Sequence, residues 1–239
     1  MNLVTLQFKT TTNFEENLLK LVSLIKNTPD DSFILAPELC LNGYSYDNLY
    51  EAVNISTKAI KILKEISINK TISLTLTTSK DDKFFNTLFI FSKGNIIHTQ
   101  SKVKLFPLGD EDKYFEAGNI ENMKIIDING IKVASLICFE LRFIELWQRI
   151  RGADIILIPA MWGKLRKENF ETLTKAIAVT NQCFVLASDS SNDNMASSSA
   201  IITPFGKVNL DDSKEMITQP FDKKEIKKMR TYLNIGLKG

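Results

Sequence analysis

Two strand-like runs that flank a cysteine constrain the fold of this chain more than any other feature. Residues 131–137 (IKVASLI) are apolar and β-branched and end at Cys138, and residues 153–159 (ADIILIP) form a second buried run about one helix later. Polar and charged residues follow Cys138 at once, which predicts a turn or a helix start. Such a unit favours a parallel sheet with the thiol at the carboxyl end of a strand, where open α/β sheets hold their ligands. Backbone N–H groups at a helix start also favour a thiolate and can hold an oxyanion.

Length and charge limit the class of protein. A chain of 239 residues holds one large α/β domain or two small ones. We expect one domain over residues 1–239, because no linker, repeat or low-complexity segment divides the chain. The formal net charge of +2 is too small to indicate nucleic acid or an anionic membrane as a partner. No run approaches the roughly 18 apolar residues of a spanning helix, and the first residues do not resemble a signal peptide, so we expect a soluble, cytoplasmic protein.

Three cysteines and one histidine argue against metal and disulfide chemistry. Cys40, Cys138 and Cys183 are widely spaced and odd in number, and no C-x-x-C pair occurs, so we expect neither a zinc site nor a disulfide framework. Cys40 and Cys183 are expected to pack in the core. His98 lies within a predicted hairpin, and we expect a half-buried structural role for it, although histidine is the commonest catalytic base.

The predicted strands and helices do not alternate simply along the chain. Apolar spacing predicts helices over residues 14–26, with Asn13 as the cap, and over residues 54–66, 169–180 and 223–232. Strand-like runs cover residues 3–8, 32–36, 71–78 and 182–188, and paired runs predict hairpins over residues 86–101, 123–137 and 198–210. Helices follow the first two strands, hairpins occupy the middle, and helix–strand units return later. This order suits a two-sheet sandwich with helices on its outer faces better than one doubly wound sheet.

Three functional side chains fall at or just past the ends of predicted strands. Glu38 follows the run over residues 32–36, Lys102 follows the second strand of a hairpin, and Cys138 ends the run over residues 131–137. Each alone is weak evidence of a site. Together they supply a base, a cation and a nucleophile, the set that covalent acyl transfer needs when no histidine takes part.

The three blocks that carry these side chains resemble those of the nitrilase superfamily of carbon–nitrogen hydrolases. Residues 37–44 (PELCLNGY) are similar to the family's P-E-L-x-L-x-G-Y. Residues 102–106 (KVKLF) are similar to K-x-H-L-F, with Lys104 in place of the usual histidine, and residues 137–146 (ICFELRFIEL) are similar to I-C-Y-D-L-R-F-P-E-L. Shorter matches occur at residues 85–87, 152–162 and 199–206. The blocks look closest to the small-amidase branch, which includes ω-amidase and deaminated glutathione amidase.

The resemblance implies both a fold and a reaction. The fold would be a four-layer α-β-β-α sandwich of two mixed β-sheets. The reaction would cleave a non-peptide carbon–nitrogen bond without a metal or organic cofactor, with Cys138 as nucleophile, Glu38 as general base and Lys102 as the catalytic lysine. A thioester would form on Cys138. Lys102 and the backbone N–H of Phe139 would hold the oxyanion, at roughly 3 kcal/mol per donor.

A second acid is described for the family on the loop after the lysine. Glu111 lies seven residues before Gly118, a spacing similar to the family's E-x6-G. Asp110 competes for the role and Glu116 is a weaker candidate. We therefore expect Glu111 to be the fourth catalytic residue, with Asp110 as the alternative.

The substrate expected from the resemblance is a small linear amide of the ω-amide type. N-carbamoyl amines are the alternative, and a non-catalytic binding protein on the same fold is the rival from another class. Arg142 is suited either to a substrate carboxylate or to a structural ion pair. Tyr44 and Trp162, which belong to the matching blocks, are expected beside the substrate with Arg142.

Several positions depart from the family pattern. Glu140 stands where aspartate is usual, Ile144 where proline is usual, and Ser197 where glycine is usual. Whether these changes alter specificity stays open from the sequence. Because relatives commonly dimerise around the helix that follows the cysteine block, the resemblance also implies a homodimer or a larger homo-oligomer.

Overall fold

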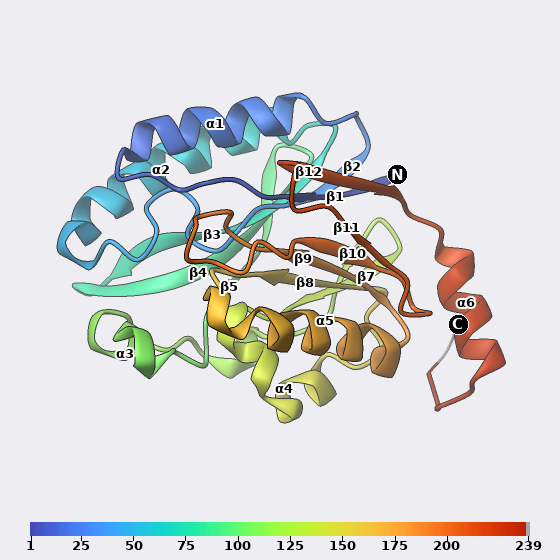
Figure 1. The fold of residues 1–239 in the computed structure, drawn as a ribbon. Helices are drawn as coiled ribbons and strands as arrows, with labels where there is room; N and C mark the ends of the chain where they lie inside the picture. Colours follow the sequence, from blue (N-terminus) through green and yellow to red (C-terminus); the bar gives the residue numbers. More distant parts are fainter. Residues whose placement is uncertain (238–239) are drawn as a thin grey trace.

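The computed structural model describes residues 1–237, which form two six-stranded sheets packed face to face (Figure 1). In the first sheet the strand order is β12-β1-β2-β3-β4-β5. β1, β2 and β3 are parallel, whereas β12 and β4 are antiparallel to their neighbours and β5 regains the direction of β3. The strand bounds are β1 Asn2–Leu6, β2 Ser32–Leu35, β3 Thr71–Lys80, β4 Lys83–Ser92, β5 Asn95–Ser101 and β12 Met216–Pro220.

The second sheet has the order β11-β10-β9-β8-β7-β6. Its three central strands, β7, β8 and β9, are parallel, and antiparallel strands flank them on both sides. The strand bounds are β6 Ile126–Ile128, β7 Ile131–Ser135, β8 Ile155–Pro159, β9 Phe184–Ser188, β10 Ala200–Ile202 and β11 Val208–Leu210. The parallel pair β7 and β8 is the strand unit that the sequence predicts around Cys138.

Helices cover the outer faces of both sheets. α1 (Phe14–Lys26) and α2 (Leu49–Ile66) lie on the first sheet, and α5 (Lys167–Asn181) lies on the second with α4 (Ile144–Arg149) near it (Figure 1). Alternation along β2 explains this layering. Ile34 packs in the cluster that α1 and α2 share, while Phe33 and Leu35 pack with residues of the second sheet. The expected four-layer α-β-β-α sandwich is confirmed.

The predicted elements agree with the structure except at a few positions. α1 and α6 (Lys223–Tyr232) have the predicted bounds, and Asn13 caps α1 by accepting a hydrogen bond from the Glu16 N–H. α2 begins at Leu49 rather than residue 54, because Leu49 and Ala52 extend its buried stripe toward the N-terminus. The predicted loop over residues 108–118 contains the short helix α3 (Glu111–Tyr114). β12 was not predicted, since this short edge strand has one buried residue and no clear apolar alternation.

The carboxyl ends of the parallel strands in both sheets lie together. The Thr5 hydroxyl donates to the Ala187 carbonyl, and the Ser188 hydroxyl donates to the Leu6 carbonyl, so the ends of β1 and β9 meet across the two sheets. The Glu38 N–H donates to the Ala160 carbonyl in the same way, just past β2 and β8. Residues that follow these strands therefore share one end of the sandwich.

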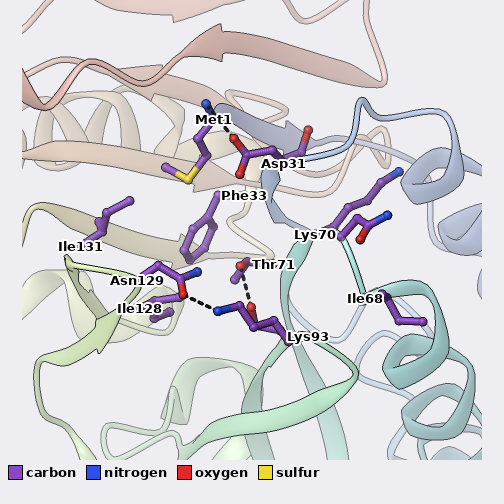
Figure 2. Close-up of a pocket in the computed structure, with 13 residues that line it drawn as sticks. Met1, Asp31, Phe33, Ile68, Lys70, Thr71, Lys93, Ile128, Asn129 and Ile131 are labelled. Atoms are coloured by element: carbon purple, nitrogen blue, oxygen red, sulfur yellow. Dashed lines mark hydrogen bonds and ion pairs between the residues drawn. The ribbon is translucent and has the colours of Figure 1, made fainter.

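The opposite end of the sandwich has a cavity of about 330 Å³ (Figure 2). It lies at the start of β2 and β3 and beside the turn between β6 and β7. Polar side chains that line it form hydrogen bonds with one another. The Lys93 ammonium donates to the Asn129 side chain, and the Thr71 and Ser92 hydroxyls form a hydrogen bond. The residues that line it include no cysteine, histidine or glutamate.

None of the helices within residues 1–237 combines the length and the apolar composition of a membrane-spanning helix.

Candidate active site

Glu38 lies just past β2 and is fully buried. Its Oε1 accepts hydrogen bonds from the Asn86 amide and the Lys102 ammonium, both at 2.9 Å. Its Oε2 accepts from the backbone N–H of Met161 at 3.1 Å. The carboxylate therefore joins β4 and the end of β5 in the first sheet to the segment that follows β8 in the second.

Lys102 directly follows β5 and is 1% exposed. Its ammonium lies 2.9 Å from Glu38 Oε1 and 2.7 Å from Glu111 Oε2, and it also reaches the Tyr44 hydroxyl at 3.2 Å. Burial lowers the pKa of this ammonium, but the carboxylates of Glu38 and Glu111 raise it by more, so the pKa stays above its ordinary value. Lys102 is thus a permanent cation between two carboxylates.

The structure brings Glu111, and not Asp110, to the lysine. Glu111 is fully buried at the start of α3, and its Oε2 also accepts the Phe106 N–H at 2.8 Å. The Tyr44 hydroxyl donates to its Oε1 at 3.3 Å. Asp110 points to solvent and pairs with Lys113 at 2.8 Å. A sharp turn separates these two neighbours, because the backbone of Asp110 is left-handed with φ of 57°.

Cys138 begins a 3₁₀ turn over Cys138–Arg142, three residues beyond the end of β7. Its backbone is left-handed with φ of 48°, a conformation that non-glycine residues rarely adopt. Cys138 is 8% exposed and is one of the residues that line a small pocket. Burial raises the pKa of this thiol well above its ordinary value and Glu38 raises it further, while Lys102 and the Met161 N–H lower it. Lys102 therefore favours the thiolate, but the thiol is the resting form.

The raised pKa of Cys138 predicts how its alkylation depends on pH. Below the pKa, the fraction of thiolate grows about tenfold with each pH unit. We expect the rate of iodoacetamide labelling at Cys138 to rise about tenfold per unit between pH 6 and pH 9 without a plateau. Mass spectrometry of the labelled peptide measures this rate, and the Cys138→Ala variant gives the background from Cys40 and Cys183. A plateau near neutral pH would instead indicate a preformed thiolate.

Seven residues line the pocket above Cys138: Phe106, Cys138, Phe139, Arg142, Met161, Trp162 and Arg166. The guanidinium of Arg142 lies 4.9 Å from the centre of the Trp162 ring, and that of Arg166 lies 5.3 Å from the centre of the Phe106 ring. Arg142 donates to the Asn169 side chain at 3.1 Å. Within the described chain neither guanidinium forms an ion pair, so Arg142 has not taken the structural ion pair that the sequence left open.

Tyr44 lies elsewhere in the site. Its hydroxyl contacts Lys102 and Glu111. Its ring packs edge-on against the ring of Phe115, with 6.4 Å between the two ring centres. Trp162 is buried, and its indole N–H donates to the Arg166 carbonyl. Of the three residues expected beside the substrate, Arg142 and Trp162 line the Cys138 pocket, and Tyr44 contacts the charged cluster behind it.

Sequence reasoning gave no site role to Asn86, Asp189 or Arg166. Asn86 donates to Glu38 and, at 3.3 Å, to Glu111; its place in the matching block at residues 85–87 was the available signal. Arg166 reaches the pocket past Gly163, where a Cβ atom would lie 2.8 Å from the guanidinium. No sequence pattern marks that contact.

Asp189 follows β9 and is fully buried. Its carboxylate accepts the backbone N–H groups of Trp162 at 2.7 Å and Ser197 at 3.0 Å, and burial raises its pKa to about 7. Asp189 thereby holds the segment next to Met161, which contacts Glu38. Ser197 has a left-handed backbone with φ of 54°, which explains why glycine is usual at this position.

The remaining sequence candidates lie apart from the site. Cys183 is fully buried in the core of the second sheet, and Cys40 is fully buried under α1 and α2, as expected. His98 is half-buried in the middle of β5, opposite Ile90. In the described part of the chain, no three side chains of histidine, cysteine, aspartate or glutamate are grouped as a metal site.

Comparison with known proteins shows the family and the fold. The family model described as carbon–nitrogen hydrolase matches residues 3–231. The 2-oxoglutaramate amidase of Bacillus subtilis is 31% identical over 206 residues, which cover 81% of this chain and 78% of that protein. The deaminated glutathione amidase of Escherichia coli O157:H7 is 28% identical over 219 residues, covering 84% and 81%. A Saccharomyces cerevisiae structure from branch 10 of the nitrilase superfamily superposes with a TM-score of 0.87 at 24% identity, covering 99% of this chain and 95% of that one.

Proposed function

Because the chain belongs to the carbon–nitrogen hydrolase family, we propose that it is an amidase that cleaves a small linear ω-amide through a thioester on Cys138. The observation that carries this proposal is the meeting of Glu38, Lys102 and Cys138 at one end of the sandwich. Glu38 and Lys102 share a hydrogen bond of 2.9 Å, and Glu38 also accepts the backbone N–H of Met161, which lines the same pocket as Cys138. Nucleophile, base and cation therefore come together from three distant segments.

The first half of the reaction forms the thioester. The Cys138 sulfur attacks the amide carbon while Glu38 takes the thiol proton, which is consistent with a thiol that is protonated at rest. Lys102 and the Phe139 N–H stabilise the oxyanion that develops on the amide oxygen. When the intermediate collapses, the carbon–nitrogen bond breaks and Glu38 returns the proton to the nitrogen. Ammonia or an amine leaves, and the acyl group stays on sulfur.

The second half releases the acid. Glu38 takes a proton from water as the water oxygen attacks the thioester carbon, and the carbon–sulfur bond breaks. The sulfur recovers the proton from Glu38, and a carboxylic acid leaves. Glu111 does not need to exchange a proton in either half. Its two contacts with Lys102, at 2.7 and 3.0 Å, hold the ammonium in place.

The pocket favours an amide that carries a carboxylate at its other end. Arg142 and Arg166 both line the pocket, each stacked on an aromatic ring. A carboxylate on the substrate would supply the anionic partner that the described residues do not provide, and guanidinium groups bind carboxylates in a bidentate manner. Relatives named 2-oxoglutaramate amidase and deaminated glutathione amidase support the same substrate class.

Substitution of Arg166 tests this assignment. We expect Arg166→Met to lower kcat/KM for an ω-amide with a terminal carboxylate by about 30-fold, since a hydrogen-bonded charge pair contributes roughly 2 kcal/mol. A neutral amide of the same length should lose less than about threefold. Steady-state ammonia release measures both. The matched control is Lys164→Met, two residues away, exposed and outside the pocket lining.

The outcomes separate the candidate functions. Equal losses on both amides would contradict a carboxylate-binding role for Arg166. Turnover of N-carbamoyl amines with none of amides would favour the alternative substrate class, and binding without any turnover would favour the non-catalytic protein. The homo-oligomer implied by the family resemblance stays a prediction.

A further inference from the structure

One buried carboxylate outside the triad links the two segments that carry the sulfur and the ammonium. Glu140, two residues after Cys138, is fully buried. Its Oε2 accepts the backbone N–H of Ile137 at 2.7 Å, and its Oε1 accepts the backbone N–H of Val103 at 2.6 Å. Ile137 directly precedes Cys138, and Val103 directly follows Lys102. A single side chain thus bridges the second sheet to the first at the two residues next to the reacting groups.

The two N–H groups that donate to Glu140 lie outside the hydrogen-bonded strands of both sheets. β7 ends at Ser135 and β5 ends at Ser101, so neither Ile137 nor Val103 belongs to a strand. The turn that follows has the left-handed backbone of Cys138, which persists only where the surroundings hold it. Glu140 is the side chain that satisfies both N–H groups at once.

Both carboxylate oxygens of Glu140 accept backbone N–H groups, and the side chain is fully buried. Among the described residues no hydrogen bond joins it to the Cys138 sulfur, so the role of Glu140 runs through the backbone of the two segments. Burial raises its pKa to about 7, and the Ile137 and Val103 N–H groups lower it. At about pH 8 its carboxylate form predominates.

We propose that Glu140 is a positioning residue that fixes the Cys138 turn against Lys102 by accepting a backbone N–H from each segment. The proposal rests on the proposed function for its kinetic readout. It assigns a physical role to the position where the family usually has aspartate. The link needs a group that accepts on both oxygens, and a carboxylate is the only side-chain group that does so.

Two substitutions separate acceptor capacity from side-chain reach. Glu140→Gln keeps the shape, but its amide NH₂ would face one of the two N–H donors and break that link. We expect kcat to fall about 100-fold with KM changed less than about threefold, because a misplacement of about 1 Å can cost that much in rate. Glu140→Asp keeps both acceptors with a shorter reach, and we expect it to retain at least about tenfold more kcat than the glutamine variant.

The experiment measures kcat, KM and the rate of Cys138 alkylation at about pH 8. Alkylation needs no amide substrate, so it tests Glu140 even if the protein turns over no amide and the proposed function fails. The matched control is Glu145→Gln, an exposed carboxylate just beyond the same turn that pairs with Lys104 at 3.6 Å. It should behave as the wild type.

The proposal is overturned if folded Glu140→Gln keeps wild-type kcat and a wild-type alkylation rate. If that variant does not fold, the same measurements on Glu140→Asp decide whether Glu140 is a positioning residue. A lower kcat at unchanged KM, with a changed alkylation rate, supports the positioning role. A lower melting temperature with unchanged kinetics would make Glu140 a purely structural residue and refute it.

Discussion

Replacing Cys138 with alanine is expected to lower kcat/KM for amide hydrolysis by about 10⁴-fold or more. The reason is that the reaction proposed for this protein passes through a bond to the Cys138 sulfur, and no neighbouring group can form it. The other two cysteines are fully buried, and neither lines the pocket. Steady-state ammonia release measures the loss.

Mass spectrometry gives a second measurement of the same substitution. The intact wild-type protein mixed with an amide substrate should gain the mass of the acyl group, and the alanine variant should not. Cys183→Ala is the matched control, since it removes a thiol from the core of the second sheet and leaves the pocket unchanged. An alanine variant with turnover within tenfold of the wild type would rule out a thioester on Cys138.

Replacing Lys102 with methionine is expected to cost both stability and activity. Methionine leaves Glu38 and Glu111, both fully buried, without the cation that lies 2.9 and 2.7 Å from them. Removing one partner of a buried ion pair costs about 3–5 kcal/mol of unfolding free energy, which corresponds to a fall in melting temperature of roughly 10 °C for a chain of this size. Loss of an oxyanion donor should lower kcat/KM by about 10³-fold.

A double variant separates these two effects. Lys102→Met combined with Glu111→Gln removes one charge of each sign, so of the two carboxylates that contact Lys102 only Glu38 remains. We expect at least half of the lost melting temperature to return while the activity does not. Lys113→Met, which removes an exposed cation paired with Asp110, is the control. Unchanged melting of the Lys102→Met single variant would show that the lysine does not balance these carboxylates.

The sequence predicts the positions of the central groups because each follows a predicted strand. Glu38, Lys102 and Cys138 stand directly after or close to the end of a strand, and the carboxyl ends of parallel strands meet. The choice of Glu111 over Asp110 needed the resemblance, because both are acids on one polar loop. In the structure the left-handed backbone at Asp110 turns one inward and the other outward.

The features that were not predicted have three physical causes. Asp189 and Glu140 act by accepting backbone N–H groups from distant segments, and the sequence does not show which N–H groups a fold leaves outside its ladders. Arg166 reaches the pocket only because Gly163 leaves space for its guanidinium. The edge strand β12 has too few apolar residues to form a recognisable run.

The division of the site between the two sheets ties activity to the integrity of their shared interface. Glu38 and Lys102 follow strands of the first sheet, whereas Cys138 follows a strand of the second. If one sheet slid slightly over the other, the Cys138 sulfur would move away from the Glu38 carboxylate. Every strand would still be paired within its own sheet. Turnover should therefore vanish early during denaturation, when the secondary structure is still largely present, and neither sheet could supply the site without the other.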